Sequence, residues 1–175
     1  MKVAAYQAPL ESSRCEDARA LIREQVVRCE TLGVEILCCP EAVLGGLADY
    51  AAQPAAIAID VDGGGLDETA QASDSVTTIL GFTEIDRSGR LFNAAAVLSQ
   101  GVVVGVYRKL HPAINRSVYH AGSGTPVFTV GRLTFGIVIC RDSIFPEPAA
   151  AMPPAKGGAE LVLEARRHDI PHRST

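Results

Sequence analysis

The chain has 175 residues, a formal net charge of −4 and 47% hydrophobic residues. This length and apolar content predict one globular domain with a buried core, and the acidic excess argues against binding to nucleic-acid phosphates. No apolar run reaches the roughly 18–20 residues that cross a bilayer. Because Met1–Gln7 also lacks the apolar stretch of a signal peptide, a cytoplasmic protein without a membrane partner is expected.

The N-terminal part predicts a strand, a helix and a second strand. Val3–Tyr6 is a short apolar run that suits a strand. Ser13 and Glu16 have the spacing of a capping box, and apolar residues then recur every three to four positions until Gly33 supplies a left-handed stop. Val34–Cys39 follows as a buried strand that Pro40 ends.

The middle of the chain predicts strands joined by hairpins. Residues 45–75 are rich in small and polar residues, and the one regular element expected there is a short helix after Leu66. Turns rich in Asp, Ser and Gly then separate three strand-like runs, Val76–Phe82, Leu91–Leu98 and Val102–Tyr107.

The C-terminal part begins with an irregular loop over residues 111–125. Two further strands, Val127–Val130 and Leu133–Ile139, are expected to form a hairpin about Gly131. A helix is expected after Pro146 and one more strand over 159–163, before an irregular tail at 164–175.

Cysteine usage points away from a metal site. The five cysteines form no C-x-x-C pair, and the adjacent Cys38 and Cys39 would point to opposite faces of a strand. Neighbours that diverge in this way cannot hold one metal ion together, so no metal is expected. Most of the five are expected to be small buried hydrophobes in a reducing compartment, with one left as a candidate nucleophile.

Three reactive groups stand just past predicted strand ends: Glu41, Lys109 and Cys140. A thiol with an ordinary pKa of about 8.5 is mostly protonated near neutral pH, so a nucleophilic cysteine needs a base or a positive neighbour. Glu41 can accept the thiol proton, and Lys109 can stabilise the thiolate and the oxyanion that forms when the thiolate attacks a carbonyl. The three groups together are suited to acyl transfer.

The segments around these residues resemble the signature blocks of the nitrilase superfamily, the carbon–nitrogen hydrolases. The three blocks occur in the family's order, as Cys39-Pro40-Glu41, Tyr107-Arg108-Lys109-Leu110-His111-Pro112 and Ile139-Cys140-Arg141-Asp142-Ser143-Ile144-Phe145-Pro146-Glu147. Further matches are Gln7, Gly81-Phe82-Thr83-Glu84 and Asn93.

The resemblance implies an α/β fold of the αββα sandwich type and a Glu–Lys–Cys triad. Glu41 would be the general base, Lys109 the oxyanion stabiliser together with the backbone N–H of Arg141, and Cys140 the nucleophile that forms a thioester. The substrate would be a small amide, nitrile or carbamoyl compound, with an amidase favoured over a nitrilase by the breadth of the family. No cofactor is implied.

Roles can also be predicted for three further side chains near the triad. His120 stands where many family members carry a second carboxylate, so it is a candidate for lining the pocket. Asp142 is expected to fix the turn behind the nucleophile through backbone hydrogen bonds, and His111 to support the loop rather than to react. Pairing Cys140 with His111 or His120, as in papain, remains an alternative.

The chain ends 35 residues after Cys140, whereas family members usually continue further. This predicts a truncated hydrolase domain over 1–163, with a sandwich that is incomplete in its C-terminal part. An unfinished sheet also predicts a homodimer or higher homo-oligomer. The alternative function is a catalytically impaired remnant that only folds or oligomerises.

Overall fold

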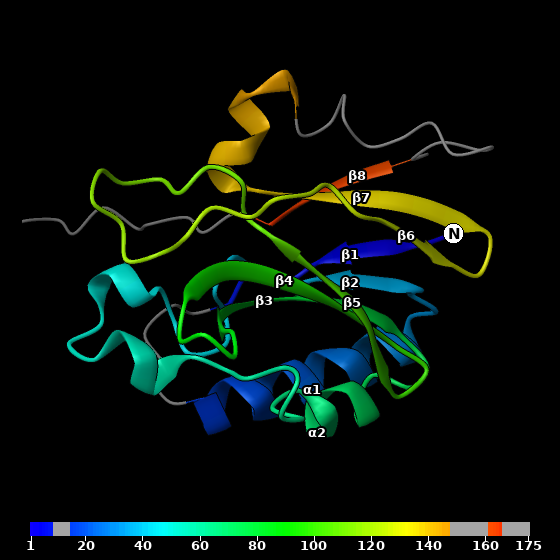
Figure 1. Ribbon diagram of the computed structural model, residues 1–175. Coiled ribbons are helices and arrows are strands. Elements are labelled where there is room, and N and C mark those ends of the chain that lie inside the picture. Colours follow the sequence, from blue (N-terminus) through cyan, green and yellow to red (C-terminus); the bar gives the residue numbers. More distant parts are fainter. Residues whose placement is uncertain (9–14, 148–160, 166–175) are drawn as a thin grey trace, which may run out of the picture.

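The computed structural model describes residues 1–8, 15–147 and 161–165, including the side chains of all but 161–164. Its described strands form two sheets (Figure 1). The larger sheet has the order β1-β2-β3-β4-β5, with β1 Val3–Ala5, β2 Ile36–Cys38, β3 Thr77–Ile85, β4 Leu91–Ser99 and β5 Val102–Arg108. The smaller sheet has the order β6-β7-β8, with β6 Val127–Val130, β7 Leu133–Ile139 and β8 Leu161–Ala165.

Strand pairing follows the connections that the sequence predicts. β1, β2 and β3 are parallel neighbours, because long connections that contain helices join them. β3, β4 and β5 pair antiparallel through two tight hairpins, and β6 and β7 form the hairpin about Gly131, whose φ is +60°. These hairpin predictions are confirmed.

The helices lie in the connections. α1 spans Cys15–Thr31 and α2 spans Asp67–Gln71, and three short 3-10 helices are η1 (Ala48–Tyr50), η2 (Pro54–Ile57) and η3 (Cys140–Ile144). Gly33 adopts a φ of +64° just after α1, which confirms the predicted left-handed stop. The predicted capping box cannot be compared in full, since Ser13 lies outside the described residues. In the part that the structure describes, no helix has the length and apolar character of a membrane span.

Two apolar cores lie on the two faces of the five-stranded sheet. α1 and α2 cover one face, and the three-stranded sheet covers the other (Figure 1). Ile22 and Val26 of α1 pack into the core on the helical side, which also contains Cys39. Cys38 belongs instead to the core between the sheets, so the predicted divergence of these two thiols is confirmed.

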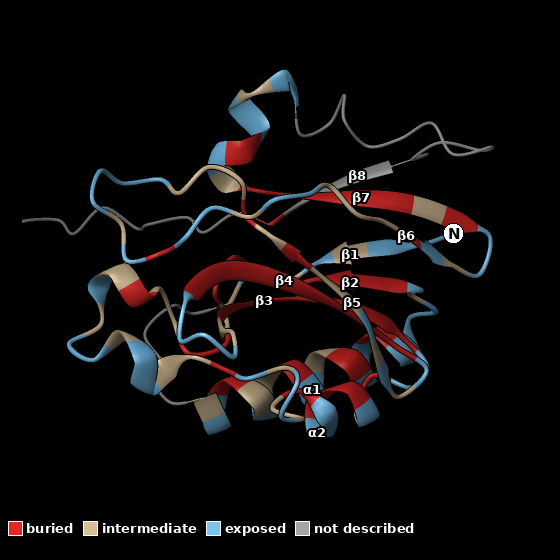
Figure 2. Cartoon of the chain, in the orientation of Figure 1, coloured by how far each residue is buried: buried red, intermediate tan, exposed pale blue. Residues whose placement is uncertain are grey.

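Burial on both faces explains why the central strands have nearly continuous apolar sequences. Every residue of β4 is buried, and β3 is buried except at Ile85 (Figure 2). β5 is an edge strand, and its Val102 and Val104 are exposed. The site described below lies where these buried strands end.

The αββα order is observed for its first three layers within the described residues. η3 lies on the outer side of the smaller sheet, and the helical residues Pro146 and Glu147 follow it (Figure 1). The rest of the helix expected after Pro146 lies outside the described residues. β8 ends at Ala165, so Glu164 and Ala165 belong to the sheet rather than to the predicted tail, and 166–175 are outside the description.

Candidate active site

Glu41 occupies a tight turn that follows β2 and lies directly against β3. Cys39 and Leu44 donate backbone hydrogen bonds to Ile79 and Gly81 of β3, at 2.9 and 3.1 Å, so the turn is fixed at both ends. Gly81 permits this contact, because a Cβ there would lie 3.0 Å from Cα of Glu41 and 2.7 Å from the next backbone nitrogen. The turn places Glu41 in the interior, only 4% exposed.

Lys109 follows β5 and is also buried, at 2% exposure. Its backbone N–H donates to the carbonyl of Asn93 on β4 and its carbonyl accepts from Gly122, each over 2.8 Å. The side chain reaches Glu41 with an Nζ to Oε1 distance of 2.5 Å. Both groups are therefore buried, whereas a lone carboxylate or lysine usually lies at the solvated surface.

Asn93 is the third member of this buried cluster. Its Nδ2 donates to Oε1 of Glu41 over 2.8 Å, so Lys109 and Asn93 contact the same carboxylate oxygen. Its own Oδ1 is buried and has no donor among the described residues. The sequence pointed to Asn93 only as a motif match, and not as a site residue.

Cys140 is the first residue of η3, directly after β7. Its φ of +45° is uncommon for a residue other than glycine, and the backbone turns sharply there from strand to helix. The residue is partly buried, and none of the five cysteines is in a disulfide.

A pocket of about 120 Å³ brings Glu41, Lys109 and Cys140 together. Asn93 also lines it. The other lining residues come from η1, from the residue before η1 and from the loop after β5: Leu47, Asp49, Tyr50, Pro112, Ala113, Ile114 and Tyr119. Three groups from three strand ends, far apart in the sequence, therefore share one small and mainly apolar cavity with a buried ion pair in its wall.

Asp142 holds the backbone around the nucleophile. Its fully buried carboxylate accepts the O–H of Tyr107 over 2.7 Å, the backbone N–H of His111 over 2.8 Å and that of Ile139 over 3.3 Å. Burial, and then the hydrogen bond to Asp142, raises the pKa of Tyr107 well above its usual range. The predicted role of Asp142 in fixing this turn is consistent with these bonds.

The predicted histidines lie outside the pocket lining. His120 is exposed and its ring lies beside Phe92, with 5.9 Å between centroids, so its imidazole does not replace a second carboxylate in this pocket. His111 stacks on Phe145 at 4.1 Å. The Arg141 side chain is exposed and donates to the carbonyl of Ala113 over 2.9 Å, while its backbone N–H directly follows Cys140.

Two further pocket residues were not found from the sequence. The Tyr119 hydroxyl accepts the backbone N–H of Ala48 and contacts Oγ1 of Thr83, both at 2.6 Å. Asp49 accepts from Ser117 and from the backbone N–H of Val118, so η1 and the loop after β5 are joined at the pocket rim. Asp49 is the second carboxylate of the pocket lining, and it comes from η1 rather than from the position of His120.

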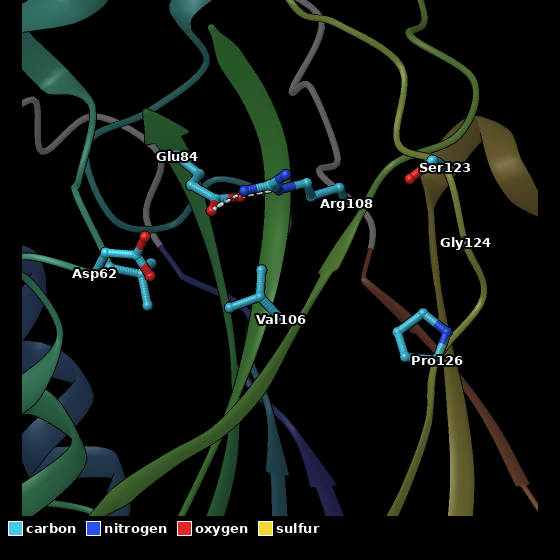
Figure 3. A pocket seen from close by; sticks show the side chains of 8 residues that line it. Asp62, Glu84, Val106, Arg108, Ser123, Gly124 and Pro126 are labelled. Atoms are coloured by element: carbon cyan, nitrogen blue, oxygen red, sulfur yellow. Dashed lines mark hydrogen bonds and ion pairs between the residues drawn. The ribbon is translucent and has the colours of Figure 1, made fainter. Parts of the chain in front are cut away.

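A larger and more open hollow of about 380 Å³ lies elsewhere, and residues of β3 and β5 line it together with residues 61–62 and the loop before β6 (Figure 3). Arg108 and Glu84 face each other in it with two hydrogen bonds of 2.7 Å, and Asp62 and Ser123 lie at its edges. The arginine is already paired, and the lining contains no cysteine, lysine or histidine. The smaller pocket therefore carries the reactive groups.

No metal site accompanies the pocket: the described side chains contain no group of three or more His, Cys, Asp or Glu that could hold an ion. The groups that line the pocket include the Cys140 thiol, the Glu41 carboxylate and the Lys109 ammonium.

Known proteins resemble this chain in sequence and in fold. The carbon–nitrogen hydrolase family model matches residues 2–174. The Schizosaccharomyces pombe protein named "Probable nitrilase C965.09" is 33% identical over 101 residues, which are 55% of this chain and 36% of that protein.

Two solved structures share the fold over 95% of this chain. One is a mutant of the amidase from Nesterenkonia sp. in complex with butyramide, with a TM-score of 0.76 and 20% identity. The other is glutamine-dependent NAD+ synthetase from Acinetobacter baumannii in complex with ADP, with a TM-score of 0.77 and 19% identity. The chain spans 65% of the amidase chain and 32% of the synthetase chain. The chain belongs to the carbon–nitrogen hydrolase family, the nitrilase superfamily.

Proposed function

We propose that the small pocket hydrolyses the carbon–nitrogen bond of small amides through a thioester on Cys140. The observation that carries the proposal is the buried ion pair of Glu41 and Lys109, 2.5 Å long, in the wall of the cavity that Cys140 also lines. Burying two charges costs free energy that a surface pair avoids, and perturbed or buried charges concentrate at functional sites.

In the first half of the reaction, Cys140 attacks the amide carbonyl while Glu41 accepts the thiol proton. Both donors to Glu41 contact Oε1, so Oε2 is the oxygen that would take this proton. Nζ of Lys109 and the backbone N–H of Arg141 would stabilise the oxyanion of the tetrahedral intermediate. Glu41 then returns the proton to the nitrogen, and ammonia leaves.

In the second half, water enters the position of the departed ammonia. Glu41 accepts a proton from this water, the resulting hydroxide attacks the thioester, and the acid is released as Cys140 regains its proton. One carboxylate thus serves both half-reactions, which requires that it stay fixed. The bonds from Lys109 and Asn93 supply that restraint.

The pocket size favours amides with few heavy atoms. A cavity of roughly 150 Å³ accommodates benzene, and this pocket is somewhat smaller at about 120 Å³. The butyramide complex of the Nesterenkonia amidase supports the choice of an amide, because that protein has the same fold. We therefore propose an amidase rather than a nitrilase.

The test is to trap the thioester. Incubation with a short aliphatic primary amide, followed by acid quench and mass spectrometry, should add the mass of the acyl group to the peptide that contains Cys140. Cys140→Ser should remove this adduct, whereas Cys15→Ser, at the start of α1, should retain it.

Glu41→Gln and Lys109→Met should each abolish turnover; turnover that survives both would exclude the triad and favour a cysteine–histidine pair. Absence of adduct and of product in the unmodified chain would favour the remnant that only folds or oligomerises.

A further inference from the structure

The side-chain amide of Asn93 has two polar ends, and the proposed reaction uses only the one that holds Glu41. Asn93 lies on β4 directly opposite Thr83, is 3% exposed and lines the pocket. One end of its amide, Nδ2, holds Oε1 of Glu41 over 2.8 Å. The other end, Oδ1, is a buried acceptor without a donor among the described residues.

A buried carbonyl oxygen without a donor is unfavourable, because folding has removed it from water without replacing the hydrogen bond. The cost can be recovered when a ligand brings the missing donor. Since Nδ2 is already held by Glu41, the amide of Asn93 cannot rotate to present its nitrogen to the pocket without breaking that bond. The pocket lining therefore includes a side chain that is held on the carboxylate by its nitrogen and whose oxygen is still an unused acceptor.

We propose that Asn93 positions the substrate: its Oδ1 accepts an N–H of the scissile carboxamide while its Nδ2 holds Glu41. This inference rests on the proposed amide hydrolysis and adds a specificity determinant to it. A carboxamide nitrogen carries N–H groups that match the acceptor, whereas the corresponding ester oxygen carries none. The contact also places the leaving nitrogen beside the carboxylate that must protonate it.

The amide-to-ester ratio tests this directly. The readout is kcat/KM for butyramide divided by kcat/KM for methyl butyrate, which has the same acyl group but no N–H. Asn93→Leu, similar in size but without polar atoms, should lower this ratio about fivefold, the value of one neutral hydrogen bond near 1 kcal/mol. A purely structural role would lower both rates by the same factor and leave the ratio unchanged.

A second variant separates the two ends of the side chain. Asn93→Asp keeps an acceptor at Oδ1 but replaces the donor to Glu41 with a like charge. It should lower kcat/KM for both compounds, but it should lower the amide-to-ester ratio less than Asn93→Leu does. Ser99→Ala is the matched control, because it removes a 3.0 Å hydrogen bond to Thr77 at the opposite end of the same two strands. Its ratio should equal that of the unmodified chain.

A binding measurement keeps the inference testable without turnover. In Cys140→Ala, titration followed by NMR should show butyramide binding that Asn93→Leu weakens about fivefold, and methyl butyrate binding that it leaves unchanged. Equal weakening of both ligands, or an unchanged ratio in the kinetic experiment, overturns the role of Asn93 and leaves the amidase proposal standing. If the unmodified chain hydrolyses neither butyramide nor methyl butyrate, the amidase proposal is overturned. If Cys140→Ala does not bind butyramide, both proposals are overturned.

Discussion

Tyr107 donates its phenolic O–H to Oδ2 of Asp142 over 2.7 Å, and this bond joins β5 to η3, the turn that follows β7. Tyr107 is on β5, two residues before Lys109, and Asp142 follows β7, two residues after Cys140. One buried carboxylate therefore connects the strand end that supplies the ammonium to the turn that supplies the thiol.

Tyr107→Phe should uncouple these two elements while retaining the ring. We expect the free energy of unfolding to fall by about 1.5–3 kcal/mol, the usual contribution of a hydrogen bond to a charged group. We also expect kcat to fall more than KM rises, because the nucleophile and the oxyanion donor lose their fixed separation. Urea unfolding and steady-state kinetics measure the two effects.

A matched control for this variant is Tyr6→Phe, which removes a hydroxyl beside the core on the helical side of the larger sheet. It should leave kcat unchanged. Loss of stability in Tyr107→Phe with no change in kcat would show that the bond is structural alone.

The buried ion pair leads to a prediction about stability. Replacing one partner of such a pair leaves a buried charge uncompensated, so Glu41→Gln and Lys109→Met should each lower the free energy of unfolding by about 3–5 kcal/mol. The double variant buries neither charge. Its loss in the free energy of unfolding should therefore be smaller than the sum of the two single losses, by about 2 kcal/mol or more. Denaturant titration of the four proteins measures this coupling; additive losses would contradict the pair as a stability determinant.

The strand ends that carry Glu41, Lys109 and Cys140 could be predicted from the sequence because strongly local signals mark them. Pro40 ends a ladder, β-branched and aromatic runs identify strands, and Gly131 marks a hairpin. Glu41 and Lys109 follow strands of the larger sheet, whereas Cys140 follows a strand of the smaller sheet. That the thiol should meet the other two groups was therefore expected from the resemblance to the nitrilase superfamily and not from strand ends alone.

The contacts that complete the pocket could not be predicted in the same way. Asn93 sits within a buried strand, where a polar side chain gives no indication of its partner, and Asp49 comes from a 3-10 helix in a stretch without periodicity. The exposed position of His120 could not be predicted, because the path of the loop after β5 depends on tertiary contacts: Tyr119 accepts from Ala48, and Val118 donates to Asp49.

Gly81 offers a test of how the turn holding Glu41 is positioned. Gly81→Ala would place a methyl group against the carbonyl of Pro40 and 2.7 Å from the nitrogen of Ala42, so the turn must move away from β3. We expect activity to fall at least tenfold, because a displacement of about 1 Å can cost a hundredfold. Gly124→Ala is the control, since a Cβ there has no neighbour within 4 Å among the described atoms; equal activity of the two variants would contradict this account of Gly81.

The buried cysteines should make stability fall at alkaline pH. Burial raises the pKa of Cys38 from 9.0 to about 11, and burial also raises the pKa of Cys39 above its usual range. A raised folded-state pKa means that the unfolded chain releases these protons first. The stabilisation from Cys38 is therefore complete below about pH 9 and is lost as pH rises through 11, and that from Cys39 continues to fall at higher pH.

Two measurements check this behaviour of the thiols. Cys38→Ala should flatten the decline in the free energy of unfolding between pH 9 and 11 relative to the unmodified chain. In the folded protein at pH 8, iodoacetamide should label Cys140 well before Cys38. A pKa raised from 9.0 to about 11 lowers the thiolate fraction of Cys38 by about 100-fold. Labelling after urea unfolding should make the two rates similar, which separates the effect of burial from that of local sequence. Equal rates in the folded protein would contradict both the burial of Cys38 and the selective reactivity that the proposed nucleophile requires.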